Sequence, residues 1–425
     1  MEQVTQTRAN LQSQLIQQFK ATRALTMEIC EPLQPEDFVV QPVVEVSPPK
    51  WHLAHTTWFF EMFILSKYVA DYRLFDKDYP YLFNSYYQNE GERWIRSERG
   101  ALSRPWVQEI MSYRNYVDEH VLHFLKETEL SEDQLSVFQI GINHEQQHQE
   151  LLVYDIKHIL GINPIFPSYR TSKNEKSYQP NLEINWLKVE EGLYEIGYEG
   201  PAFHFDNEQG LHRVHLHAFK VQDRLVTNAE FLEFVEAGGY QDFNYWLMEG
   251  HEWVKENNIR APFYWLKENN EWFYFTLAGK VKINLAEPVT HISFYEADAF
   301  AKWKGMRLPT EFEWEVACKI HSPQIPEEAN FMDQRNYRTM PRKGNNPQFY
   351  GDVWEWTNSA YLPYPYYKKV DGALGEYNGK FMINQMVLRG GSFATMKNHI
   401  RPTYRNFFHP HLRWHFTGFR LVQYI

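Results

Sequence analysis

The chain has 425 residues, a length that favours two domains over a single hydrophobic core. Its net charge is −11, and it contains no basic block of the kind that binds nucleic acid or an anionic membrane surface. We therefore expect small-molecule partners, with no nucleic acid and no membrane. The aromatic content of 17% is typical of a small-molecule pocket, and equally of extra core volume.

Residues 1–28 alternate polar and apolar side chains at helical spacing, without the uninterrupted apolar core of a signal peptide or a membrane-spanning helix. A cytoplasmic protein is expected. Cys30 and Cys318 are its two cysteines, so neither a disulfide framework nor a thiolate metal cluster is predicted. Any metal would be bound by histidine and carboxylate side chains.

Four helices are predicted in the first part of the chain, at 5–30, 51–70, 115–129 and 131–160, because apolar residues recur there at helical spacing. They predict a four-helix bundle over residues 1–165, and the interior of such a bundle is a common place for a metal site. The polar, proline-flanked stretch 166–182 is typical of a linker.

The character of the sequence changes in residues 183–425. Short alternating segments such as 193–197 and 213–221 are separated by Gly, Pro and Asn, and helices are predicted at 228–237 and 293–304. We expect a mixed α+β or mostly irregular second domain.

The strongest chemical signal is the segment HEQQHQE at 144–150. Residues four apart on a helix advance by about 40°, so His144 and His148 share a face and can bind one ion. Glu150 lies about 200° beyond His148 and is expected to have a supporting role. The segment at 51–55 offers a third ligand, because either His52 or His55 could point across the bundle. Three imidazoles leave positions open for O₂ and substrate, which favours Fe(II) over a closed zinc site.

The residues alone do not exclude two hypotheses that place the protein in other functional classes. The HExxH pattern at 144–148 is that of zinc peptidases, in which the glutamate is the general base. The longer metzincin pattern fails because Leu151 stands where its glycine should be. The second reading is a non-catalytic binding module with a structural metal. His215 and His217 alternate with apolar residues and are expected on a solvated strand face.

Two groups of motifs resemble known families. The segments WHLAHTTWFFE at 51–61 and HxxxHxE at 144–150 resemble the DinB-like bundle of the ergothioneine sulfoxide synthases. The second half resembles the formylglycine-generating-enzyme type of C-type-lectin-like domain. The motifs that match are PVxxISxYxA at 288–297, RLPTExEWE at 307–315, GDVWEWT at 351–357, RGGSF at 389–393 and GFR at 418–420.

The resemblance implies an α+β multidomain protein with a DinB-like four-helix bundle at 1–165, a linker at 166–182 and a sulfatase-modifying-factor domain at 183–425. It implies Fe(II) bound by His55, His144 and His148, choosing His55 over His52, and an active site between the domains. The implied reaction uses O₂ to join the imidazole C2 of hercynine to cysteine, which gives hercynylcysteine S-oxide.

The resemblance also assigns roles to other residues. Gln147 and Asn406 would hold hercynine, while Phe407 and Phe408 would help to close the pocket over the metal. Tyr86 and Tyr87 would lie in the active site, where a phenol can donate a proton or hydrogen atom during the oxidation.

Cysteine is the expected thiol. The branch that uses γ-glutamylcysteine has arginine in the region of Tyr86 and Tyr87, and aspartate where this chain has Phe408. Arg93, Arg96 and Arg99 lie close by in the sequence and could still pair with a carboxylate, although a solvated basic face is expected for them.

Two related activities are less well matched. Formylglycine-generating enzymes use a pair of late cysteines, and this chain has none after Cys318. Ovothiol-pathway synthases usually carry an additional methyltransferase domain, whereas this sequence ends directly after the lectin-like motif. A selenoneine-type synthase of the same fold stays open.

Overall fold

The computed structural model describes residues 2–87, 90–171, 182–369 and 378–425, which form two compact units. The described residues up to Pro164 belong to unit 1, and those from Ile165 onward belong to unit 2. Residues 172–181 of the predicted linker 166–182 lie outside the described residues, so the linker stays a prediction. Along the described residues, no helix combines the length and the apolarity needed to cross a lipid bilayer.

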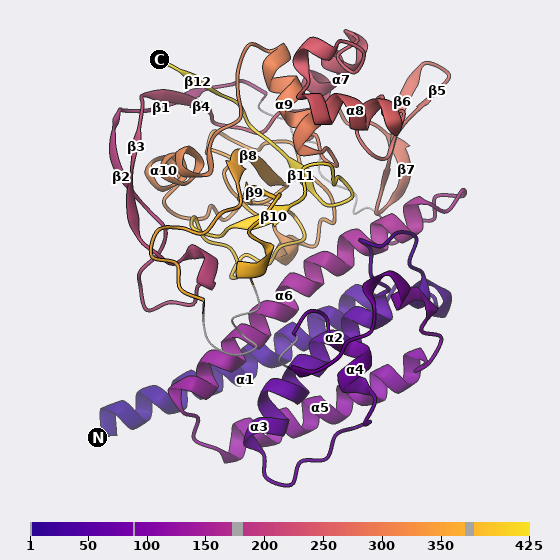
Figure 1. Ribbon diagram of the computed structural model, residues 1–425, viewed down its shortest axis with the longest axis vertical. Helices are drawn as coiled ribbons and strands as arrows, with labels where there is room; N and C mark the ends of the chain where they lie inside the picture. Colours follow the sequence, from indigo (N-terminus) through magenta and orange to yellow (C-terminus); the bar gives the residue numbers. More distant parts are fainter. Residues whose placement is uncertain (1, 88–89, 172–181, 370–377) are drawn as a thin grey trace. The chain divides into compact units, whose positions relative to one another are not determined.

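Unit 1 is built from helices (Figure 1). Helix α2 packs on both α5 and α6, and α1 packs along α6. All 12 residues of α2 are buried, so its polar side chains must find partners inside the bundle. The helix bounds are α1 Glu2–Cys30, α2 Pro49–Phe60, α3 Ser66–Tyr68, α4 Tyr79–Phe83, α5 Val107–Glu127 and α6 Glu132–Gly161.

The predicted helix at 51–70 is present but interrupted. After Phe60 the chain forms a π-helical turn over Glu61–Leu65 before the short α3. Glu61 is fully buried there and accepts hydrogen bonds from the hydroxyls of Tyr72 (2.9 Å) and Tyr113 (2.6 Å). Burial raises the pKa of Glu61 above its ordinary value. Such turns are frequent at functional sites, and the histidines of α2 lie just before this one.

Helix α6 carries the two histidines of the 144–150 motif. A capping box starts it, in which the Ser131 hydroxyl accepts from the Gln134 backbone (3.2 Å) and the Gln134 side chain accepts from the Ser131 backbone (2.8 Å). The helix then continues for 30 residues, which confirms the prediction for 131–160. It is long enough to present several turns of one face to α2.

Unit 2 mixes short helices with small sheets (Figure 1). Among its described residues, the sheets have the strand orders β1-β4-β12, β10-β9-β8-β11, β2-β3 and β5-β6-β7. The helix bounds are α7 Asn228–Glu236, α8 Met248–Glu256, α9 Phe294–Trp303 and α10 Glu311–His321. The strand bounds are β1 Trp186–Val189, β2 Gly192–Ile196, β3 His212–Leu216, β4 Phe219–Gln222, β5 Trp265–Glu268, β6 Glu271–Thr276, β7 Gly279–Lys282, β8 Trp354–Ala360, β9 Met386–Arg389, β10 Asn406–Phe408, β11 Thr417–Gly418 and β12 Val422–Tyr424.

The alternating segment at 213–221 divides between two strands, β3, which pairs with β2, and β4, which pairs with β1 and β12. Residues between β3 and β4 interrupt the alternation, so the two halves enter different sheets.

The late sequence motifs of unit 2 meet in its core as buried ion pairs. Arg389 and Arg405 both contact Glu311, at 2.9 and 2.8 Å. Arg420 contacts Glu355 at 2.5 Å. The side chains of these residues are at most 3% exposed, and a buried charge is tolerated only when it is paired in this way. These motifs therefore support the fold of unit 2.

Candidate metal centre

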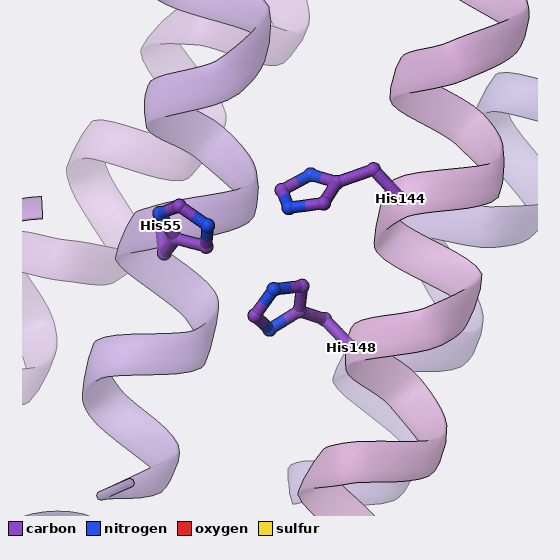
Figure 2. A group of neighbouring side chains, drawn as sticks. All are labelled: His55, His144 and His148. Atoms are coloured by element: carbon purple, nitrogen blue, oxygen red, sulfur yellow. The ribbon is translucent and has the colours of Figure 1, made fainter. Parts of the chain in front are cut away.

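Three histidines converge inside unit 1. His55 comes from α2, and His144 and His148 come from α6, with their rings turned toward one another (Figure 2). One ring nitrogen of each lies within 4.8 Å of the others, and the ring centroids are 4.6 to 4.9 Å apart. His55 and His144 are buried, and His148 is half-buried. We call this group the histidine triad.

Burial sets the protonation state of the triad. It lowers the pKa of His144 to about 3, and it lowers the pKa values of His55 and His148 well below the ordinary value. The neighbouring imidazoles lower the pKa values of His55 and His148 further. All three rings are therefore neutral at pH 7. Neutral imidazole is the form that binds a metal ion.

His55 is held in one orientation. Its Nδ1 lies 2.6 Å from the carbonyl oxygen of Phe83, and because a carbonyl only accepts, the proton is on Nδ1. The indole rings of Trp51 and Trp58 stack on either side of the imidazole, at centroid distances of 4.5 and 5.5 Å. The remaining nitrogen, Nε2, is buried without a hydrogen-bond partner among the described residues. An unprotonated nitrogen in this position fits a metal ion.

His52, the alternative third ligand, does not belong to the triad but lies between His148 and Asp155. Its Nδ1 lies 2.9 Å from Nδ1 of His148, and its Nε2 lies 3.0 Å from a carboxylate oxygen of Asp155. Asp155 was not singled out in the sequence. It follows His148 by seven residues, which is about 700° of helical rotation. Asp155 therefore lies on nearly the same face of α6 as His148, and this spacing is the sequence signal that could have identified it.

The position of Glu145 argues against the zinc-peptidase reading. Its carboxylate accepts from Arg23 (2.9 Å), Arg114 (2.5 Å) and the Thr26 hydroxyl (2.6 Å), which belong to α1 and α5. Burial alone would raise the pKa of Glu145, but Arg114 and Arg23 lower it to about 2. A carboxylate fixed by two arginines is a poor general base.

The predicted tyrosines lie near the triad. Tyr87 is fully buried, with its ring 5.5 Å from Trp58 and 5.2 Å from Phe63, and Trp58 in turn stacks on His55. Tyr86 is half-buried and stacks on Tyr87 at 4.6 Å. The catalytic role of both tyrosines stays a prediction.

The predicted substrate-binding residues are divided between the units. Gln147 is half-buried on α6 of unit 1, whereas Asn406, Phe407 and Phe408 form β10 in unit 2. The Phe407 ring stacks on Tyr361 at 4.0 Å, and the Phe408 ring lies 3.9 Å from that of His415. Their joint role in one pocket stays a prediction.

The predicted basic face is wrong for one of its three arginines. Arg93 and Arg96 are exposed, but Arg99 is only 3% exposed. Arg99 donates to the hydroxyls of Ser47 (2.8 Å) and Ser85 (3.2 Å), and its guanidinium lies 3.3 Å from the ring centre of Trp51. The flat guanidinium stacks on the indole of Trp51, the same ring that stacks on His55. Arg99 is therefore buried in the bundle instead of being exposed to solvent.

A second group of possible ligands occurs in unit 2. Glu191, His215 and His217 lie close together, and all three are exposed to solvent. This agrees with the predicted solvated strand face.

Comparisons with known proteins match both parts of the chain. The DinB superfamily matches residues 18–152, and the sulfatase-modifying factor enzyme 1-like domain matches residues 172–425. These matches confirm the expected fold class, a helical DinB-like region followed by an α+β domain of the formylglycine-generating-enzyme type.

Curated relatives are similar to large parts of the chain. The hercynine oxygenase of Mycolicibacterium smegmatis is 30% identical over 315 residues, covering 67% of this chain and 71% of that protein. The hercynine oxygenase of Mycobacterium tuberculosis is 31% identical over 312 residues, with the same coverage. The formylglycine-generating enzyme of Streptomyces coelicolor is 27% identical over 252 residues, covering 46% of this chain and 73% of that enzyme.

Proposed function

Because the chain belongs to the hercynine oxygenase family, we propose that it is an Fe(II)- and O₂-dependent sulfoxide synthase that joins hercynine to cysteine. The reaction forms a bond between the imidazole C2 of hercynine and the cysteine sulfur. One oxygen atom of O₂ becomes the sulfoxide oxygen, and the other leaves as water with the two hydrogens lost from C2 and the thiol. The product is hercynylcysteine S-oxide.

The histidine triad is the single observation that carries the proposal. Three neutral imidazoles would hold Fe(II) and leave positions open, which is a donor set suited to an oxygenase. When bound, Fe(II) supplies the activation of O₂, which by itself reacts poorly with closed-shell organic molecules. The protein keeps the ligands unprotonated by burial and holds His55 between two indoles.

Other residues would position the substrates and move a proton. Gln147 follows His144 by three residues on α6 and would hold hercynine together with Asn406. Phe407 and Phe408 would exclude water from the reacting groups. Tyr87 would donate a proton or hydrogen atom, which is supported by its burial one aromatic ring away from His55.

Cysteine is the proposed donor because aromatic residues stand where the branch that uses γ-glutamylcysteine has charged ones, an arginine that can pair with the γ-glutamyl carboxylate and an aspartate. Tyr87 is buried, and Phe408 packs against His415, so neither position offers a charge. Arg99 is the group on which the alternative rests, since it is a buried arginine whose hydrogen bonds go to serine hydroxyls.

One assay tests the reaction and the thiol together. Anaerobically purified protein receives Fe(II), hercynine and equal concentrations of cysteine and γ-glutamylcysteine, and O₂ uptake and product masses are then measured. We expect thiol-dependent O₂ uptake and the cysteine-derived sulfoxide, with the product ratio giving the ratio of kcat/KM. A preference for γ-glutamylcysteine would contradict the cysteine assignment and direct attention to Arg99.

The variants His55→Ala, His144→Ala and His148→Ala should each lose bound iron and activity. His120→Ala is the matched control, since it removes a half-buried imidazole of unit 1 that bonds to the Tyr116 carbonyl and belongs to neither group of possible ligands. Unchanged iron loading in all three triad variants would eliminate the site. Zinc-dependent proteolysis without O₂ uptake would select the peptidase instead, and hercynine binding without turnover would select a binding module. Turnover only with the substrates of the ovothiol pathway would select an ovothiol-type synthase, and turnover only with a selenium donor would select a selenoneine-type synthase.

A further inference from the structure

We propose that His52 and Asp155 orient His148 as a metal ligand, through a hydrogen-bonded series of Asp155, His52 and His148 that we call the His52 relay. The inference rests on the proposed metal-binding role of the histidine triad. It adds two positioning residues that lie outside the triad and act through His148.

The contacts allow one arrangement of protons in which His148 serves as a ligand. Its Nδ1 faces His52, so Nε2 is the nitrogen left for the metal, and Nδ1 must then carry the proton. Nδ1 of His52 must accept that proton, which leaves the proton of His52 on Nε2. The carboxylate of Asp155 accepts from this Nε2–H at 3.0 Å. Each hydrogen bond thus fixes the direction of the next.

His55 and His148 share this pattern. His55 donates from Nδ1 to the Phe83 carbonyl, and His148 would donate from Nδ1 to His52, so both present Nε2. A carbonyl or carboxylate on the far nitrogen of a metal-binding histidine fixes its tautomer and raises its basicity. In the His52 relay an imidazole transmits the effect of the carboxylate.

The helix geometry explains why a bridging imidazole is needed. Asp155 follows His148 by seven residues, so the two lie on the same face of α6 about 10 Å apart along the axis. His52 extends from α2 into this gap. Asp155 is fixed in turn by the backbone amide of Ser47, which donates to the same carboxylate oxygen at 2.9 Å. Both His52 and Asp155 are at most 3% exposed, so water does not compete for the two hydrogen bonds that Asp155 accepts.

Substitutions at His52 separate hydrogen bonding from packing. In His52→Ala, the Nδ1–H of His148 loses its acceptor, and the ring can rotate or change tautomer. In His52→Asn, the side-chain carbonyl oxygen takes approximately the place of Nδ1 and can still accept from His148. Asp155→Asn keeps the shape of the carboxylate and removes its charge, so it should have the smallest effect.

The experiment uses Co(II) as a probe, because it does not consume O₂ in the assay and its visible absorption reports the ligand set. Co(II) dissociation constants are measured for the full-length wild type and variants, together with thermal unfolding of the metal-free proteins. His120→Ala is the control, since it removes a partly buried imidazole of unit 1 that bonds to the Tyr116 carbonyl. We expect His52→Ala to bind Co(II) about 10- to 100-fold more weakly, with partial recovery in His52→Asn and no change in the control.

The outcomes separate the relay from the proposed function. Equal Co(II) affinity in the wild type and His52→Ala would overturn the relay alone. Equal losses in His52→Ala and His52→Asn, with unfolding temperatures falling in parallel, would also overturn it, because packing would then explain the effect. Failure of the wild type to bind Co(II) would remove the metal centre, and with it both the proposed function and the relay.

Discussion

Tyr87 offers a test of the proposed chemistry at a single atom. Tyr87→Phe keeps the ring that packs on Trp58 and Phe63 and removes the hydroxyl. If the phenol donates a proton or hydrogen atom, sulfoxide formation should fall by about 10²-fold or more, while iron binding is unchanged. Thiol should be diverted toward the sulfinic acid, which mass spectrometry of the products detects.

Tyr86→Phe is the matched comparison, because Tyr86 stacks on Tyr87 but is half-buried. Its effect ranks the two phenols as donors. Wild-type rates and product ratios in both single variants and in the double variant would show that neither tyrosine is catalytic.

Asp352 predicts a pH dependence of stability. Its buried carboxylate accepts from Asn330 (2.7 Å), the Met340 backbone (2.8 Å) and Gln348 (2.9 Å), but burial dominates and raises its pKa to about 6, from 3.8. The folded state therefore binds this proton more tightly than the unfolded state. The resulting stability is fully present below pH 3.8 and is lost as the pH rises through 6.

Asp352→Asn should remove this dependence, and asparagine tolerates the left-handed backbone found here, with φ of 61°. The wild type should gain up to about 3 kcal/mol relative to the variant between pH 7 and pH 4, measured by urea unfolding. Because other groups titrate equally in both proteins, the difference isolates Asp352. A constant difference across this range would contradict the prediction.

Among the secondary-structure elements, α1, α5 and α6 are joined by one buried carboxylate. Glu145 of α6 accepts from Arg23 of α1 and Arg114 of α5, and its side chain is 0% exposed. Glu145→Gln would leave the buried guanidinium of Arg114 without its carboxylate partner, and Arg23 would keep only its ion pair with Asp118. The free energy of unfolding should fall by about 3–5 kcal/mol, measured by urea denaturation.

Glu132→Gln provides the control, because Glu132 is exposed in the first turn of the same helix. It should change stability by no more than about 0.5 kcal/mol. A loss below about 1 kcal/mol in Glu145→Gln would show that the ion pairs do not hold the three helices together.

At the scale of the whole molecule, all members of the triad and of the His52 relay belong to unit 1. A fragment of residues 1–164 should therefore keep the Co(II) affinity of the full chain. It should form no sulfoxide, because Asn406, Phe407 and Phe408 belong to unit 2. Co(II) titration and the O₂-uptake assay check the two halves of this prediction.

Circular dichroism of the fragment is the necessary control for folding. A helical fragment that does not bind Co(II) would mean that unit 2 supports the ligands. Sulfoxide formation by the fragment would mean that the residues of β10 are not required.

The helices and the motifs could be predicted because each depends on residues that are close together in the chain. Spacing along a helix is a property of near neighbours, so α1, α6, α7 and α9 lie within three residues of their predicted bounds, and His144 and His148 share a face as expected. Helix α5 begins eight residues earlier than predicted. A hydrogen bond from the Trp106 backbone to the Glu109 side chain caps its start, and such a cap has no strong sequence signal. The family motifs identified the two kinds of domain for the same reason, since each is a short local pattern.

Which polar groups meet depends on how the helices pack, which the sequence did not show. His52 and His55 differ by about 60° around α2, and both are buried, so the sequence alone could not choose between them. The rotation of α2 about its axis made that choice, and it is set by the packing of the whole helix against α5 and α6. The same packing brings Asp155 to His52, Glu145 to two arginines and Arg99 into the bundle. These contacts join residues far apart in the chain. Local spacing shows which groups share a helix face, as for His148 and Asp155, but it does not show which groups of other helices they meet.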